Sequence, residues 1–105
     1  MLAPGDVVLF RHSESELPLG PKRIVALGGD VVEICAGVLR VNGQDVPSAY
    51  GRGNPQNPNY AFGPVDVPEG GVFIVGDNWD NSRDSRHWGP LTTADIIGIV
   101  RLSAE

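Results

Sequence analysis

The sequence predicts a single all-β domain, a mainly antiparallel β meander or partly open barrel with little helix. Three observations favour this fold class. The 105 residues suffice for one hydrophobic core. The 14 glycines and 9 prolines break the chain into short pieces, and its apolar segments are short and rich in β-branched residues. Nothing marks a domain boundary, so residues 1–105 are expected to form one domain.

Four strands are expected in the first half of the chain. Short apolar runs predict them at residues 6–10, 23–27, 31–35 and 38–41. The polar, proline-bounded segment 12–21 is typical of a surface loop. Asn42-Gly43, after the fourth run, is the strongest short-range hairpin signal in the sequence. These patterns together predict a meander.

The second half begins with a long segment rich in glycine, proline and asparagine, residues 47–64. A connection of this length is either functional or disordered, and its aromatic residues favour an exposed excursion docked on the sheet over a binding role. A turn at 67–71 leads into an expected strand at 72–75. Residues 91–95 predict one helical turn with a threonine cap, and residues 96–102 predict a last strand.

Charge and composition exclude several classes of partner. The formal net charge of −5 argues against a nucleic-acid surface, because phosphate binding needs clustered lysine and arginine. No apolar run approaches the roughly 18 residues of a membrane span, and the N-terminus shows no targeting signal, so the chain as printed is expected to be soluble. Cys35 is the only cysteine. It is expected to be a small buried apolar residue.

Several kinds of site lack the residues that they require. Neither HExxH nor DxDxDG occurs, and His12 and His87 lie far apart in the sequence, so no metal or other cofactor is expected. A Ser-His-Asp site would need one of these histidines as its base, yet no GxSxG motif accompanies either. His87 is instead expected to be a partly exposed loop residue. A glycosidase-type carboxylate pair stays open among the 13 acidic residues, although nothing singles one out.

Lys22 differs from the other cationic side chains, which are all arginines. A lysine that is desolvated can lose its proton and act as a general base, whereas an arginine effectively cannot. Lys22 lies at the start of an apolar strand, where burial would have this effect. From the residues alone, an ordinary solvated lysine beside a loop remains the alternative.

Ordered motifs cover nearly the whole chain. They are PGDVVLF, KRIVALGGD, GVLRVNGQDV, VPEGGVFIVGDN and GDNWDNSRDSRHWG, followed by IIGIV. In this order they resemble the catalytic domain of type I signal peptidases, the membrane-bound Ser-Lys serine endopeptidases that remove signal peptides from exported proteins. The resemblance runs from about Leu2 to Val100, and the long composite pattern GDNxDNSxDSRxWG makes it specific.

The resemblance implies roles for Lys22 and for the polar segment 76–89. Lys22 takes the place of the general base, and Ser82 takes that of the serine whose hydroxyl orients this lysine. Asp84 and Arg86 match an ion pair near the site, which is favoured as purely structural. The supporting turn is matched by Gly76, Asp77, Asn78, Asp80 and Asn81. The segment is therefore expected to hold the amine of Lys22 in position.

The chain departs from the family pattern at its start. In the family the nucleophilic serine lies in SMxPTLxxGD, and aligning that GD with Gly5-Asp6 places the serine about four residues before Met1. The chain as printed is therefore expected to be an N-terminally truncated domain that neither cleaves a signal peptide nor reacts with a serine-directed inhibitor. Two smaller departures are Gly28, where the family usually has proline, and Trp79, where arginine or lysine is common. No replacement nucleophile is expected among the serines that are present: Ser13, Ser15, Ser48, Ser82, Ser85 and Ser103.

Two functions follow from the resemblance. The first is part of an active signal peptidase that works on the outer side of a membrane, where an extended segment of the signal peptide adds to a sheet edge and places small side chains in shallow apolar pockets. The second is a non-catalytic module for peptide binding or assembly. Lys22 and Ser82 favour the first function, and the missing start favours the second. Exposed strand edges would also allow self-association.

Overall fold

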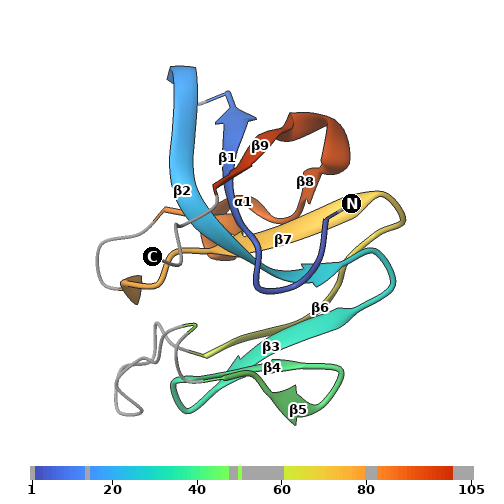
Figure 1. Ribbon diagram of the computed structural model, residues 1–105. Helices are drawn as coiled ribbons and strands as arrows, with labels where there is room; N and C mark the ends of the chain where they lie inside the picture. Colours follow the sequence, from blue (N-terminus) through green and yellow to red (C-terminus); the bar gives the residue numbers. More distant parts are fainter. Residues whose placement is uncertain (1, 14, 48–49, 51–60, 80–82, 101–105) are drawn as a thin grey trace, which may run out of the picture.

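The strands are arranged in two antiparallel sheets, which confirms the all-β prediction. A computed structural model describes residues 2–13, 15–47, 50, 61–79 and 83–100. One sheet has five strands in the order β8-β7-β2-β1-β9, and the other has four in the order β5-β4-β3-β6. Figure 1 shows the five-stranded sheet above the four-stranded one, with β2 running from the top of the view down toward the second sheet.

The five-stranded sheet is built around the long strand β2. Its strands are β1 (Val7–His12), β2 (Ser15–Leu27), β7 (Gly71–Val75), β8 (Leu91–Thr92) and β9 (Ile96–Val100). β1 pairs with β2 from Val7↔Arg23 to His12↔Ser15, whereas β7 pairs with β2 only from Arg23 to Leu27. Among the described strands, the first part of β2 is therefore paired on one side alone.

The prediction of a surface loop at residues 12–21 is wrong for most of that segment. From Ser15 onward these residues belong to β2 and pair with β1. Their side chains are mostly exposed, as a polar sequence requires, but their backbone is extended. Pro18 and Pro21 are compatible with this strand because a proline, which has no N–H to donate, fits where one side of a strand lacks a neighbouring strand.

The four-stranded sheet follows the local sequence signals more closely. Its strands are β3 (Val31–Cys35), β4 (Val38–Val41), β5 (Gln44–Asp45) and β6 (Phe62–Asp66). β3 and β4 have the bounds that the sequence predicts. Asn42 and Gly43 turn between β4 and β5 with φ values of 55° and 82°, and this left-handed geometry is the one that an Asn-Gly hairpin turn favours.

Cys35 is exposed, so the prediction of a buried cysteine is wrong. Side chains alternate along β3, and Val32 and Ile34 face the core. Cys35 therefore points away from it, because successive side chains of a strand lie on opposite faces.

The long segment 47–64 is shorter than expected, because its end forms the start of β6. Residues 48–49 and 51–60 lie outside the described part of the chain, and so does Tyr60. Tyr50 and Phe62 pack against the core, and the Phe62 ring lies 5.8 Å from the Phe73 ring. For these two residues the prediction of docked aromatic side chains is confirmed.

Both faces of β7 and of the second half of β2 are buried. Ile24 and Ile74 pack with Val8 and Phe10 on one face of the five-stranded sheet. Val25 and Ala26 of β2, with Phe73 and Val75 of β7, belong to a second cluster. The four-stranded sheet contributes Val32, Ile34 and Leu39 to the same cluster. Since a buried Val, Ile or Phe side chain stabilises the fold by roughly 1.5–3 kcal/mol, these residues of β2 and β7 contribute substantially to the stability of the core.

The C-terminal part contains the predicted helical turn. It is the 3-10 helix η4 (Thr93–Asp95), with Thr92 as its N-cap residue. The Asp95 carboxylate accepts hydrogen bonds from the Thr92 N–H at 3.0 Å and from the Thr92 hydroxyl at 3.1 Å. No helix within the described residues has the length and apolar character needed to cross a bilayer.

Candidate active site

Lys22 lies on β2, opposite Val8 of β1, and its side chain is half-buried. It lines a pocket of about 260 Å³. The other described residues of this pocket are Phe10, Leu19, Gly20, Arg83 and Trp88. The candidate base therefore has largely apolar walls around it and is not surrounded by bulk solvent.

Arg23, the next residue along β2, fixes the backbone around Lys22. Its guanidinium donates two hydrogen bonds to Asp77, at 3.0 and 2.9 Å, and a third to the Gly5 carbonyl at 3.0 Å. It also lies over the Tyr50 ring, 5.0 Å from the centroid. The hydrogen bond to Asp77 raises the pKa of Arg23 above its ordinary value, so this link stays charged. It joins β2 to the chain before β1 and to the polar segment.

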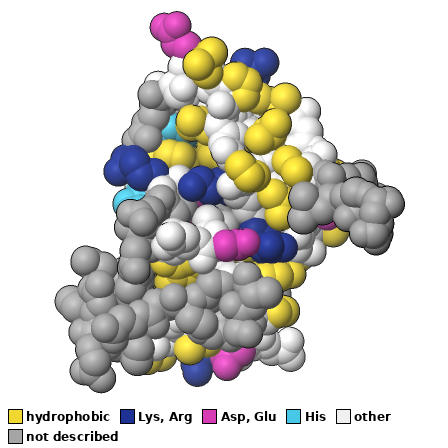
Figure 2. Space-filling view, turned by 60° about the vertical axis from the view of Figure 1, so that its left-hand side comes forward, with side chains coloured by type: hydrophobic (Ala, Val, Ile, Leu, Met, Phe, Trp, Pro, Cys, Tyr) yellow, Lys and Arg dark blue, Asp and Glu magenta, His cyan; other side chains and the backbone are white. Residues whose placement is uncertain are grey.

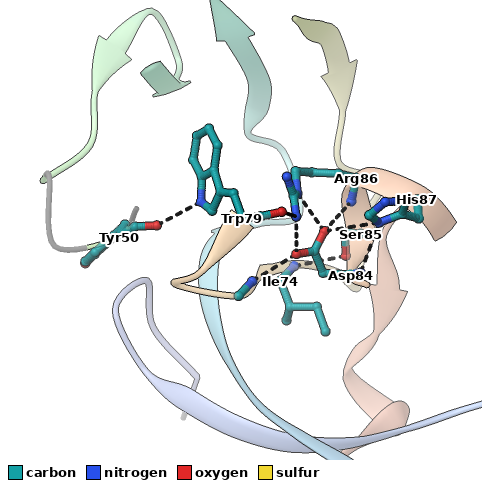
Figure 3. Close-up of polar contacts among 8 residues, drawn as sticks. Tyr50, Ile74, Trp79, Asp84, Ser85, Arg86 and His87 are labelled. Carbon is teal, nitrogen blue, oxygen red and sulfur yellow. Dashed lines mark hydrogen bonds and ion pairs between the residues drawn. The ribbon is translucent and has the colours of Figure 1, made fainter. Parts of the chain in front are cut away.

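Asp84 is fully buried and caps the short helix α1 (Ser85–Trp88). As Figure 3 shows, its carboxylate accepts hydrogen bonds from the guanidinium of Arg86, the shortest at 2.9 Å, and from the Arg86 N–H at 3.1 Å. It also accepts one from the Gly76 N–H at 2.9 Å. The Asp84–Arg86 ion pair expected from the sequence is therefore present in the structure.

Ser85 is a supporting residue that the sequence reasoning missed. Its buried hydroxyl accepts a hydrogen bond from the Ile74 N–H at 3.0 Å. Asp84 and Ser85 together satisfy backbone donors at the end of β7, and this attaches α1 to the sheet. An aspartate followed three residues later by a polar side chain is a helix-capping signal, and it could have revealed α1.

His87 lies in α1 and not in a loop, so that prediction is wrong, although the expected partial exposure is found. Its Nδ1 accepts a hydrogen bond from the Asp84 N–H at 3.3 Å, which closes the capping box of the helix. A four-residue helix carries no hydrophobic period, so its sequence resembled a polar loop.

Trp79 is buried where the family pattern commonly has a cation. Its indole N–H donates to the Tyr50 carbonyl at 3.3 Å, and the Arg86 guanidinium lies 5.4 Å from its ring centroid. Arg86 also donates to the Trp79 carbonyl at 3.2 Å. Trp79 therefore links the ion pair of α1 to the chain at Tyr50.

The remaining predicted residues divide into two groups. Gly76 is buried at the end of β7, and Asn78 is exposed between Asp77 and Trp79. Asp80, Asn81 and Ser82 lie outside the described residues, so the pairing of Lys22 with Ser82 stays a prediction. Within the part of the chain that is described, no three His, Cys, Asp or Glu side chains are grouped as metal ligands.

Comparison with known proteins identifies relatives of this chain. The family model described as "Signal peptidase, peptidase S26" matches residues 1–104. The chain is 33% identical to signal peptidase I of Leptolyngbya laminosa over 101 residues, which are 90% of this chain and 48% of that protein. It is 39% identical to probable signal peptidase I-1 of Synechocystis sp. over 90% of this chain and 50% of that protein.

A plant relative and a solved structure extend the comparison. The chain is 42% identical to probable thylakoidal processing peptidase 2, chloroplastic, of Arabidopsis thaliana, over 89% of this chain and 26% of that protein. The chain thus spans about half the length, or less, of these curated relatives. A crystal structure of a signal peptidase I from Enterococcus faecalis shares the fold, with a TM-score of 0.76, 24% identity, and coverage of 96% of this chain and 97% of that one.

Proposed function

Because this chain belongs to the signal peptidase family, peptidase S26, we propose that it is the catalytic part of a serine endopeptidase that removes signal peptides from exported proteins. The proposal assigns the general base to Lys22 and the nucleophile to the serine of the family motif SMxPTLxxGD. One observation carries it: the only lysine of the chain lies half-buried in a largely apolar pocket. Lysine is the one cationic residue type of the chain that can serve as a general base, since an arginine effectively cannot lose its proton.

The proposed reaction has two stages. The neutral amine of Lys22 takes the proton of the serine hydroxyl, and the serine oxygen attacks the carbonyl carbon at the cleavage site. The peptide C–N bond breaks, the leaving amine receives a proton from Lys22, and an ester remains between the signal peptide and the serine. Water then hydrolyses this ester. In this proposal the hydroxyl of Ser82 orients the amine of Lys22.

The edge of β2 before Lys22 is the proposed place for the substrate. Among the described strands, residues 15–22 of β2 pair with β1 alone, so an extended peptide can lie along their other side. A peptide bound there passes the pocket beside Lys22, which can receive a side chain next to the cleaved bond.

We further propose that the full-length protein works at the outer face of a membrane. The exposed large hydrophobic side chains among the described residues are Leu9, Leu17 and Ile97, which lie on β1, β2 and β9 of the same sheet. Figure 2 shows hydrophobic side chains gathered on the upper part of one face. Hydrophobic side chains gathered on one face of the surface favour contact with a lipid surface.

A cleavage assay tests the proposed function. The sequence Ser-Met-Ala-Pro-Thr is joined ahead of Leu2 in place of Met1, which recreates the family motif. We expect this extended chain to cleave a peptide that spans a signal-peptide cleavage site. Replacement of Lys22 by arginine (Lys22→Arg) should lower the rate by roughly 10²–10⁴-fold, the usual contribution of a general base.

Arg40→Lys provides the matched control, because it exchanges the same two residue types on β4, away from the pocket. It should leave the cleavage rate unchanged. Cleavage that survives in Lys22→Arg would overturn the assignment of the base. A chain that binds the peptide but never cleaves it, with the motif restored, would instead establish a non-catalytic peptide-binding module.

A further inference from the structure

Tyr50 contacts two segments that are far apart in the sequence, the chain before β1 and the middle of β2. Its ring lies under the Arg23 guanidinium, whose carbon is 5.0 Å from the ring centroid. Its hydroxyl oxygen is so close to Gly5 that a Cβ added at that glycine would lie 2.8 Å from it. Arg23 and Gly5 also contact each other, because the guanidinium donates to the Gly5 carbonyl at 3.0 Å. Gly5, Arg23 and Tyr50 therefore form one contact group.

Tyr50 is itself held in place by the rest of the molecule. Its carbonyl accepts a hydrogen bond from the indole N–H of Trp79 at 3.3 Å, as Figure 3 shows. Its N–H donates to the Pro47 carbonyl at 3.0 Å, and its side chain packs against the buried cluster that includes Val25 and Phe73. Tyrosine is also a rigid side chain, with only two rotatable bonds before its ring. It therefore offers Arg23 and Gly5 a fixed surface.

Gly5 belongs to the family motif that contains the nucleophile. The glycine of SMxPTLxxGD aligns with Gly5, so this residue joins β1 to the stretch that carries the serine. The Gly5 N–H donates to the Ile24 carbonyl at 2.8 Å, and the Ile24 N–H donates to the Asp6 carbonyl at 2.8 Å. These hydrogen bonds attach the end of the motif to β2 beside Arg23. The position of Gly5 against β2 therefore sets where the motif lies relative to Lys22.

We infer that Tyr50 is a positioning residue of the proposed reaction: it holds Gly5 and Arg23 together and so fixes the serine of the motif relative to the amine of Lys22. The inference rests on the proposed function, and it goes further by giving a role in that reaction to a residue outside the family motifs. Successive side chains of a strand lie on opposite faces. Arg23 and Tyr50 therefore act from the face of β2 opposite to the pocket that Lys22 lines.

The expected effect follows from the contact between the Tyr50 ring and Arg23. The Arg23 side chain is 22% exposed, and a cation over an aromatic ring at such a partly buried site changes an equilibrium by about tenfold. A misplaced nucleophile slows the chemical step, whereas the substrate is still bound along β2. Replacement of Tyr50 by leucine (Tyr50→Leu) should therefore lower kcat about tenfold and leave KM nearly unchanged.

The experiment has two readouts, and the first needs no cleavage activity. In the 105-residue chain, the exchange of the Gly5 N–H with deuterated water is followed by NMR. Tyr50→Leu should speed this exchange about tenfold, because a weaker hold on Gly5 lets its hydrogen bond to Ile24 open more often. In the chain extended with Ser-Met-Ala-Pro-Thr, kcat and KM are measured with the peptide of the cleavage assay.

Two control variants separate positioning from general stability. Tyr50→Phe keeps the ring under Arg23, so it should retain most of kcat and most of the protection of the Gly5 N–H. Phe62→Leu makes the same change from a ring to an aliphatic side chain in a residue that packs against the same buried cluster, 5.8 Å from Phe73. It should lower the melting temperature and leave both readouts as in the parent. A melting curve of each variant shows whether it is folded.

Each other outcome contradicts a defined claim. An extended parent chain that does not cleave the peptide would contradict the proposed function, and the role of Tyr50 in catalysis with it. If the parent cleaves and Tyr50→Leu keeps its kcat or its slow Gly5 exchange, only this inference is wrong. A change in KM with kcat intact would show that Tyr50 takes part in substrate binding instead. An equal fall in kcat for Phe62→Leu would show that lost stability is the cause, which also overturns the inference.

Discussion

Asp84 and Ser85 are the two buried polar residues that hold α1 against the end of β7. Their side chains accept hydrogen bonds from the backbone of Gly76 and Ile74. Ile74 lies next to Val75, which pairs with Arg23, the neighbour of Lys22. A shift of α1 would therefore be transmitted to the strand that carries the candidate base.

Ser85→Ala should destabilise the protein by about 1–3 kcal/mol, because it leaves the buried N–H of Ile74 without this acceptor. Chemical denaturation followed by circular dichroism measures the change. Ser13→Ala is the control, since Ser13 is exposed at the turn between β1 and β2, and it should stay within about 0.5 kcal/mol of the parent. Equal effects of the two changes would contradict the role given to Ser85.

Two aspartates of the polar segment provide a second test at this scale. Asp84→Asn removes one charge of a buried ion pair, in which the Arg86 side chain is only 9% exposed, and should cost roughly 3–5 kcal/mol. Asp77→Asn removes a pair in which the aspartate is 50% exposed, and should cost about 1 kcal/mol or less. The urea concentration at the unfolding midpoint should therefore fall further for Asp84→Asn than for Asp77→Asn. A larger fall for Asp77→Asn would contradict the burial of Asp84 and the exposure of Asp77.

The strands differ in how far their own sequence determines them. β3, β4 and the Asn42-Gly43 turn could be predicted with their bounds, because alternation and turn chemistry are local signals. The first part of β2 and all of β6 could not. Both are polar or contain proline, and they become strands through pairing with β1 and β3, which their own residue pattern does not show.

Two glycines with left-handed backbone geometry, Gly43 in a turn and Gly63 in β6, test the geometry of these elements. Gly43 and Gly63 have similar φ values, 82° and 81°. An added Cβ at Gly43 would meet nothing within 4 Å, whereas at Gly63 it would lie 2.6 Å from the Val32 carbonyl oxygen of β3. Gly43→Ala should therefore cost about 1–2 kcal/mol, and Gly63→Ala roughly 1–3 kcal/mol more. Equal melting temperatures for the two variants would contradict the pairing of β6 with β3.

The site as a whole could be predicted only in part from the sequence. The motifs indicated the Asp84–Arg86 ion pair, which is present, whereas the roles that they imply for Lys22 and Asp77 stay predictions. The motifs did not identify Ser85 as a buried acceptor or the link from Trp79 to Tyr50. A polar segment does not reveal which of its side chains point inward, since that depends on the packing of α1 against β7.

At the scale of the whole molecule, β7 and the second half of β2 lie between two hydrophobic clusters, one of which includes side chains of the four-stranded sheet. Lys22 lies at the boundary between the part of β2 that pairs with β1 alone and the part, from Arg23 onward, that also pairs with β7. The candidate base is thus attached to the buried part of β2, while the backbone before it pairs, among the described strands, with β1 alone. Catalytic groups on rigid strands keep their geometry better than those on loops.

The most direct test of Lys22 as the base is the intact mass of the protein after incubation with a serine-directed acylating inhibitor. We predict one covalent adduct on the chain extended with Ser-Met-Ala-Pro-Thr, and none on its Lys22→Arg variant or on the 105-residue chain alone. An adduct that forms equally fast on the Lys22→Arg variant would show that this lysine does not activate the serine. An adduct on the unextended chain would show that a different serine is the nucleophile.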